Sequence, residues 1–290
     1  MICNICPRRC GAERTDEGGA GACHMPAGLV VARAALHHWE EPCISGTRGA
    51  GTVFFTGCNL GCVFCQNGKI SHENFGKAIS AARLREIFEE LIAQGAHNID
   101  LVSPTHFTPW ILPALEEPLG VPVVWNSGGY ENVETLRALE GKVQIYLPDL
   151  KYALAEPARD FSLAEDYFPV AAAAIDEMFR QVGPCRMDED GLLQSGVVIR
   201  HLVLPGQLAN TKAVIDYVAG HFRPGEVLFS LMSQYTPQPG AEGILARRVS
   251  GAEYRAAVQY MRDCGLDDGF CQQRESAAAE YTPDFSLQGV

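Results

Sequence analysis

One stretch organises this sequence: Gly57-Cys58-Asn59-Leu60-Gly61-Cys62-Val63-Phe64-Cys65-Gln66-Asn67. It follows directly on the apolar run Thr52-Val53-Phe54-Phe55-Thr56, which predicts a buried strand. The cysteines therefore occupy a loop at the carboxyl end of a strand, where α/β proteins usually place their chemistry. Their C-x3-C-x2-C spacing lets Cys58, Cys62 and Cys65 hold three irons of a [4Fe–4S] cluster, since cysteine sulfur binds such clusters. A fourth iron would then have no protein ligand and would be open to a small molecule.

The number and placement of the cysteines also indicate metal binding. The chain of 290 residues holds 11 cysteines, and eight of them lie in the first 65 residues. In a reducing compartment such cysteines are metal ligands rather than disulfides. Zinc and three unrelated thiols are the alternatives for the loop, and we disfavour zinc because its usual pattern is two C-x2-4-C pairs. The three isolated thiols, Cys185, Cys264 and Cys271, are interpreted as small buried apolar side chains.

Composition narrows the class of protein. A hydrophobic content of 47% over 290 residues is enough for one large core with an appendage. The net charge of −12 argues against a nucleic-acid-binding surface. No apolar run of about 18 residues is present, so no membrane span is expected. The amino terminus has no apolar core of signal-peptide length, and we therefore expect the protein in the cytoplasm.

Residues 1–45 form a segment of different character, with the spacing Cys3-x2-Cys6-x3-Cys10-x12-Cys23. Its glycines let a short backbone fold tightly around a metal. It has few large apolar residues, so a metal would take the place of a core. Four thiolates suit a closed Zn(Cys)4 site or a second [4Fe–4S] cluster. Spacing alone does not decide between these two, and free thiols on a flexible arm are the third alternative.

From Thr52 onward the sequence alternates between predicted strands and helices. The strands cover 52–56, 98–103, 122–126, 143–147, 197–203 and 226–231, and the helices 83–95, 108–117, 131–140, 163–182, 209–220 and 251–264. Such alternation builds a parallel sheet. Six units fit an incomplete (β/α)6 barrel over residues 46–271, because no sequence remains for two more. Residues 272–290 are polar and are predicted to be a tail that is disordered or lies on the surface.

An acid and a base follow the fourth predicted strand. Asp149 and Lys151 are two residues apart, so both side chains point to one face of an extended segment. At the mouth of a barrel such a pair can bind a zwitterion. The alternative is a surface ion pair, worth about 0–1 kcal/mol. The position at a strand end favours the functional interpretation.

The cysteine run, with Phe64 before its last cysteine, resembles the radical S-adenosylmethionine (SAM) superfamily. In that family the open iron binds the amino and carboxylate groups of SAM, and an electron from the cluster cleaves SAM to a 5′-deoxyadenosyl radical. Asp149-x-Lys151 and Arg200-x4-Pro205-Gly206 resemble the glycyl-radical-enzyme activases, typified by pyruvate formate-lyase activase. The pattern over about residues 48–265 looks most like the activase-related proteins labelled PflX-like. Further segments that carry this likeness are Cys3-x2-Cys6-Pro7-Arg8-x-Cys10-Gly11, Pro104-Thr105-His106, Asn126-Ser127-Gly128-Gly129-Tyr130 and Leu231-Met232-Ser233-Gln234-Tyr235.

The resemblance implies roles for residues at the strand ends. Phe64 would pack on the adenine of SAM, and Asp149, Lys151 and Arg200 would match the charges of its methionine end. Radical SAM enzymes usually carry a Gly-Gly-Glu type segment after the second strand, and this chain has Thr105 and His106 there instead. The other residues expected at the SAM site are Asn67, Asn126 and Ser127.

The resemblance implies an oxidoreductase that cleaves SAM reductively and abstracts a hydrogen atom. Its expected partners are SAM, an electron donor such as flavodoxin or ferredoxin, and a protein substrate, with neither nucleic acid nor membrane. The first hypothesis is activation of a glycyl radical enzyme. The alternatives are radical modification of another peptide or small molecule, and a non-catalytic iron–sulfur or zinc protein that transfers electrons or binds a partner. The last is disfavoured, because an electron carrier would want four protein ligands to shield its cluster.

Overall fold

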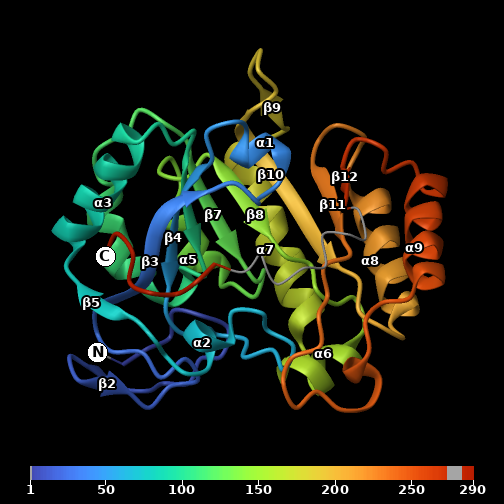
Figure 1. The fold of residues 1–290 in the computed structure, drawn as a ribbon, viewed down its shortest axis with the longest axis horizontal. Helices are drawn as coiled ribbons and strands as arrows, with labels where there is room; N and C mark the ends of the chain where they lie inside the picture. Colours follow the sequence, from blue (N-terminus) through green and yellow to red (C-terminus); the bar gives the residue numbers. More distant parts are fainter. Residues whose placement is uncertain (1, 273–282) are drawn as a thin grey trace.

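The protein is an α/β fold built on one large mixed sheet (Figure 1). A computed structural model describes residues 2–272 and 283–290. The sheet runs in the order β12-β11-β10-β8-β7-β6-β4-β3-β5, with β9 paired to β10 outside this path. Its strands are β3 Leu29–His37, β4 Ala50–Phe55, β5 Lys77–Ile79, β6 Ile99–Val102, β7 Val123–Ser127, β8 Ile145–Pro148, β9 Arg186–Met187, β10 Leu193–Leu202, β11 Leu228–Met232 and β12 Phe270–Cys271.

The six predicted strands are all present and parallel. They are β4, β6, β7, β8, β10 and β11, and each pairs in parallel with its neighbour along the path. The path ends at β5 on one side and at β12 on the other, so the sheet is open rather than a closed barrel within the described residues. The predicted α/β fold with an incomplete barrel is thereby confirmed.

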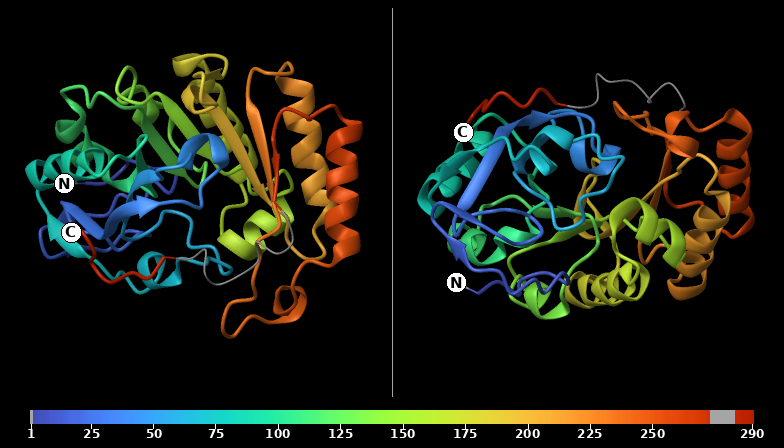
Figure 2. Two further views of the ribbon diagram at one scale, coloured as in Figure 1. Left: turned by 45° about the horizontal axis from the view of Figure 1, so that its top comes forward. Right: turned by 90° about the horizontal axis from the view of Figure 1, so that it is seen from below.

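Helices cover the outer face of the curved sheet, as the two views of Figure 2 show. Helix α3 lies close to its prediction: Ser80 caps its first turn by accepting from the amide of Arg83, and one face of the helix is buried. The predicted helix at 163–182 is α7, which starts at Tyr167, and a separate helix, α6, ends just before it, where Leu163 has a positive φ of 50°. The predicted helix at 108–117 is two short pieces, one α-helical and one 3-10. Helices and 3-10 turns are α1 Pro42–Ser45, α2 Gly68–Ser71, α3 Ala81–Ala93, η1 Thr105–Phe107, α4 Thr108–Ile111, η2 Leu112–Leu115, α5 Val133–Arg137, α6 Ala155–Ser162, α7 Tyr167–Val182, α8 Leu208–His221, η3 Gly243–Ala246 and α9 Gly251–Asp263.

The amino-terminal end of the barrel interior is filled by α1. Cys43 and Ile44 of this helix pack in one apolar cluster with Val124, Ile145 and Val198, which belong to three different strands. Figure 1 places α1 at the end of the sheet opposite α2, which follows the cysteine loop. The interior is therefore apolar at one end, and polar side chains lie toward the end that carries the cysteines.

A strand that the sequence analysis did not predict lies within residues 1–45. Strand β3 pairs antiparallel with both β4 and β5, so residues 29–37 belong to the main sheet. The more amino-terminal part holds only a short hairpin of β1 Arg14–Thr15 and β2 Gly18–Gly19. This hairpin lies at the same end of the sheet as α2 (Figure 1).

The described part of the predicted tail packs against the body of the protein. Residues 273–282 lie outside the described residues, whereas 283–290 run beside β3. The amide of Ala34 donates to the carbonyl of Gln288 at 2.8 Å, and Phe285 is only 3% exposed. This part is therefore not a disordered segment or a purely surface one. Among the described residues, no helix combines the length and the apolar composition that crossing a membrane requires.

Candidate active site

Three cysteines lie together at one end of an interior cavity of about 520 Å³. Cys58, Cys62 and Cys65 follow β4 and line this cavity. Each sulfur accepts a hydrogen bond from the chain: Leu60 N to Cys58 Sγ at 3.4 Å, Ser162 Oγ to Cys62 Sγ at 2.9 Å, and Ser71 Oγ to Cys65 Sγ at 3.2 Å. Hydrogen bonds to cysteine sulfur are one of the means by which proteins set the potential of a cluster.

Burial keeps two of these thiols protonated in the absence of metal. It raises the pKa of Cys62 to about 12 and also raises the pKa of Cys65. The positive charge of Lys151 acts in the opposite direction on both. A coordinated metal removes thiol protons outright. Three sulfurs in one loop, each accepting a hydrogen bond and two of them near a cation, therefore fit a cluster that carries negative charge.

A buried network of ion pairs forms the wall of the cavity. Lys151 Nζ donates to Asp149 Oδ2 at 2.5 Å, and Arg200 Nε donates to Asp149 Oδ1 at 3.0 Å. The other Arg200 nitrogens donate to Glu40 Oε2 at 3.0 Å and Asn126 Oδ1 at 2.6 Å. Burial alone would raise the pKa of Asp149, but Arg200 and Lys151 outweigh it and hold that pKa below its usual value. Asp149 is therefore an anion held between two cations.

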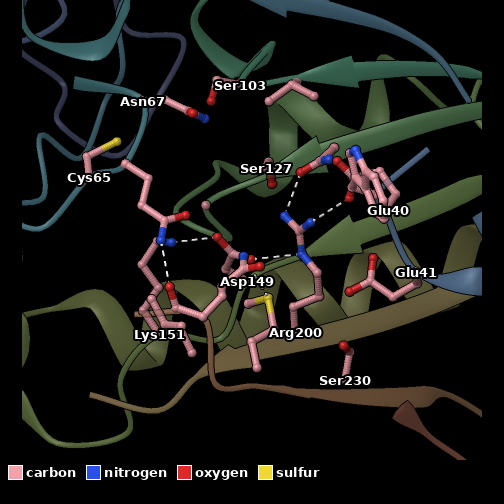
Figure 3. A pocket seen from close by; sticks show the side chains of 18 of the residues that line it. Glu40, Glu41, Cys65, Asn67, Ser103, Ser127, Asp149, Lys151, Arg200 and Ser230 are labelled. Carbon is pink, nitrogen blue, oxygen red and sulfur yellow. Dashed lines mark hydrogen bonds and ion pairs between the residues drawn. The ribbon is translucent and has the colours of Figure 1, made fainter. Parts of the chain in front are cut away.

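Figure 3 shows how these groups are arranged. Cys65 and Asn67 lie on one side of the cavity, while Glu40 and Glu41 lie on the other. Asp149, Lys151 and Arg200 lie between the two sides, joined by hydrogen bonds and ion pairs. The cavity thus has a cysteine end and a carboxylate end.

Most of the residues expected at the SAM site do line the cavity, and two do not. Those that line it are Cys58, Cys62, Phe64, Cys65, Asn67, Asn126, Ser127, Asp149, Lys151 and Arg200. Thr105 and His106 are absent from its lining: Thr105 Oγ1 donates to Glu131, and the His106 ring bonds the carbonyl of Thr56. The physical reason is the 3-10 turn that starts at Thr105, which turns both side chains away from the strand end. The structure therefore does not bring these two side chains to the cavity.

Several lining residues were missed by the sequence analysis. Ser103 is one, and its φ of 56° is a strained value for a residue other than glycine, of a kind that clusters at functional sites. Glu40, Glu41 and Ser230 are others. The adjacent carboxylates of Trp39-Glu40-Glu41-Pro42 were an available signal, but only the antiparallel course of β3 places them inside the barrel.

Comparison with known proteins agrees with this geometry. Residues 45–108 match a family described as a 4Fe-4S single cluster domain. The fold matches the crystal structure of SuiB from Streptococcus suis, with a TM-score of 0.51, 13% identity, and coverage of 77% of this chain and 48% of SuiB. The chain has the radical SAM fold. It spans about half the length of the SuiB structure that it matches.

Two further relatives extend the comparison. Methylornithine synthase (PylB) matches with a TM-score of 0.51 and 14% identity, over 80% of this chain and 74% of that one. The uncharacterized protein MJ0674 of Methanocaldococcus jannaschii is 29% identical over 277 residues, which are 91% of this chain and 75% of that protein. The expected fold is thereby confirmed, and the family match over residues 45–108 agrees with the expected [4Fe–4S] cluster. One of the similar SuiB structures is bound to S-adenosylmethionine, the second expected cofactor.

The four amino-terminal cysteines lie close to one another and beside the loop that holds Cys58, Cys62 and Cys65. The pKa of Cys6 is raised to about 12 by burial, and the other three thiols, those of Cys23, Cys3 and Cys10, are near enough to raise it further. A Cβ atom added at Gly57 would come within 3.1 Å of the carbonyl oxygen of Cys23, so the two cysteine segments are in contact. In the described part of the chain, no three or more His, Cys, Asp or Glu side chains are arranged as ligands of a single metal ion.

Arg8 fastens the amino-terminal segment to the cysteine loop. Its guanidinium donates to the carbonyl oxygens of Asn59 at 2.7 Å and Leu60 at 2.9 Å, within that loop. It also donates to Ser162 at 2.8 Å and to Leu163, at the end of α6. One side chain between Cys6 and Cys10 thus joins three segments around Cys58 and Cys62.

Proposed function

We propose that this protein is a radical SAM enzyme in which Cys58, Cys62 and Cys65 bind a [4Fe–4S] cluster that leaves one iron open for SAM. The observation that carries the proposal is the position of these thiols at the end of a 520 Å³ cavity lined by buried ion pairs. When bound, the cluster supplies the electron for reductive cleavage of SAM, which yields the radical that abstracts hydrogen. A non-catalytic electron carrier would have no use for such a cavity beside its cluster.

Two residues of the cavity wall are suited to contact SAM directly, and a third positions one of them. Lys151 uses one donor on Asp149, and an ammonium has three donors. It is therefore suited to the SAM carboxylate, while Asp149 accepts from a positive group. Arg200 is already bonded to Asp149, Glu40 and Asn126, so we assign it to positioning Asp149 rather than to direct SAM binding.

Two more specific reactions are proposed for this enzyme, and the observations support them unequally. Activation of a glycyl radical enzyme rests on the Asp149-x-Lys151 and Arg200-x4-Pro205-Gly206 segments alone. Modification of a different peptide or small molecule is favoured by a cavity whose carboxylate end lies away from the cysteines. In both, flavodoxin or ferredoxin would supply the electron. The eleven cysteines, none of them in a disulfide among the described residues, support a reducing compartment such as the cytoplasm.

The test is anaerobic reconstitution with iron and sulfide, followed by SAM and dithionite, with 5′-deoxyadenosine measured. We expect production by the wild-type protein and none by a Cys58→Ala, Cys62→Ala, Cys65→Ala variant. A Cys185→Ala, Cys264→Ala variant is the matched control, since neither thiol lines the cavity, and it should keep full production. Undiminished 5′-deoxyadenosine from the triple variant would contradict the proposal.

We further propose that Cys3, Cys6, Cys10 and Cys23 hold a second metal centre that is structural or relays electrons. Its contact with the radical SAM loop at Gly57 supports a second cluster, and four thiolates leave no vacancy for SAM. Metal analysis of anaerobically purified protein separates the alternatives: about eight irons indicate a second cluster, and about four irons with one zinc indicate Zn(Cys)4. A variant with all four changed to Ala that keeps its full metal content would refute the site.

A further inference from the structure

The carboxylate end of the cavity has not been assigned a ligand by anything above. Glu40 and Glu41 lie in the connection between β3 and α1 and line the cavity together with Ser230 of β11. Figure 3 places them on the side away from Cys65, with Arg200 in between. A SAM molecule held at the cysteine end therefore leaves this end for a second molecule.

Acidic groups outnumber basic groups here. Arg200 is near four carboxyl groups, those of Asp149, Glu41, Glu40 and Asp100. Its Nε and Nη1 atoms are taken by Asp149 and Glu40. Lys151, which also lines the cavity, is paired with Asp149. Two carboxyl groups, those of Glu41 and Asp100, thus have no salt bridge to a cation among the described residues.

One of these two carboxyl groups faces the cavity with an unsatisfied oxygen. Glu41 is 8% exposed, and within the described chain its Oε2 atom has no hydrogen-bond partner. Figure 3 shows its carboxylate directed into the cavity with no bond drawn to it. The Oδ1 atom of the fully buried Asp100 is unsatisfied in the same way. An unmade bond of this kind costs stability, so its presence at Glu41, which lines the cavity, indicates a donor that arrives with a ligand.

We propose that Glu41, supported by Glu40 and Asp100, binds a primary ammonium group of the substrate. This inference rests on the proposed radical SAM function and names the class of molecule that it modifies. An ammonium fits because it carries one positive charge and three donors in a compact group.

The test compares two small probes of equal size, n-butylamine and n-butanol, by ligand-detected NMR with the anaerobically purified full-length protein at pH 7.5. We expect the amine to bind about 10-fold more tightly than the alcohol or better, as a charged hydrogen bond predicts. Glu41→Gln, which keeps size and shape, should remove this preference. Glu189→Gln, in the exposed turn between β9 and β10, is the matched control and should keep it.

Further ligands in the same binding experiment identify the source of the ammonium group and show which results would overturn the proposal. N-acetyl-lysine methylamide binding more tightly than n-butylamine would assign the end to a lysine side chain of a peptide, and the reverse order to a free amine. Equal affinity of wild-type protein for amine and alcohol overturns the proposal, and this comparison needs no variant to fold. Displacement of the amine by SAM, or by Mg²⁺, overturns it too, because the end would then belong to SAM or to a metal.

The failure of this inference is separable from that of the proposed function. Production of 5′-deoxyadenosine by a protein that does not prefer the amine would leave the radical SAM function standing and remove the subsite. Amine preference in a protein that never cleaves SAM would do the opposite.

Discussion

Ser162→Ala tests whether the chain tunes the cluster through hydrogen bonds. Ser162 is fully buried; its hydroxyl donates to Cys62 Sγ at 2.9 Å and bonds to the hydroxyl of Tyr152 at 2.7 Å. The three groups therefore form a chain of hydrogen bonds that ends on a cluster sulfur, and such chains strengthen their members. Truncating the serine removes two bonds at once.

Two magnitudes follow from this arrangement. The stability of the protein should fall by about 1–3 kcal/mol, because the buried Tyr152 hydroxyl loses its partner. A hydrogen bond that favours the more negative, reduced cluster by about 1 kcal/mol raises its midpoint potential by about 40 mV, since 59 mV is a tenfold change for one electron. Ser162→Ala should therefore lower the midpoint potential by about 40 mV.

The assay is a redox titration of the reconstituted protein, followed by its visible absorption, together with urea denaturation. Ser195→Ala is the matched control, because Ser195 is also buried, its hydroxyl donates to the carbonyl of Val182 at 3.1 Å, and it does not line the cavity. It should lose stability without a change of potential. A Ser162→Ala protein whose potential equals that of the wild type would refute the reasoning, whatever its stability.

Four further outcomes are expected. Phe64→Ala should weaken SAM binding roughly 5- to 150-fold by the scale of base–aromatic stacking, as measured by the SAM dissociation constant; if only stability falls, Phe64 is simply a core residue between its aromatic neighbours. Lys151→Met should weaken SAM binding by about 10-fold or more with iron content unchanged, whereas Lys77→Met, on the surface, should bind SAM like the wild type. Arg8→Gln should cost about 2 kcal/mol or more in urea denaturation, because several backbone carbonyls lose a charged donor; an unchanged midpoint would contradict the fastening role. Burial lowers the pKa of His201 to about 4 in the folded state, against about 6.5 unfolded; the unfolded chain binds more protons between these values, so stability should fall by about 1.4 kcal/mol per unit as pH drops through this window, and a His201→Gln protein with the same pH slope would exclude this origin.

The sequence allowed the six parallel strands to be predicted, because each is an apolar run of strand length between helix-period segments. It also placed the cysteines and Asp149 correctly, since the carboxyl ends of parallel strands converge at one edge. Strand β3 was missed because the alanine-rich run 29–37 lies amid cysteines and glycines, which drew the interpretation toward a metal-held segment.

The residues that the sequence analysis misplaced or missed at the site have two different physical causes. Periodicity predicts where a strand ends but not the backbone of the next two residues, and the 3-10 turn at Thr105 decided the direction of His106. The sequence analysis did not predict Glu40 and Glu41 at the site for a different reason. They follow an antiparallel strand and so enter the barrel near the amino ends of the parallel strands. Functional residues in βα units are expected at the opposite, carboxyl ends.

The bonds made by Arg8 bear on the order of events during synthesis. The carbonyl of Leu163 that it reaches lies 155 residues further along the chain. At about 5–20 residues per second, roughly 8–30 s pass between translation of Arg8 and translation of that acceptor. For most of this interval the first four cysteines have been synthesised, but the surface on which they dock has not. The concentrations of available metal and of oxidants in the cell then decide whether these thiols bind metal or become oxidised before the barrel has folded.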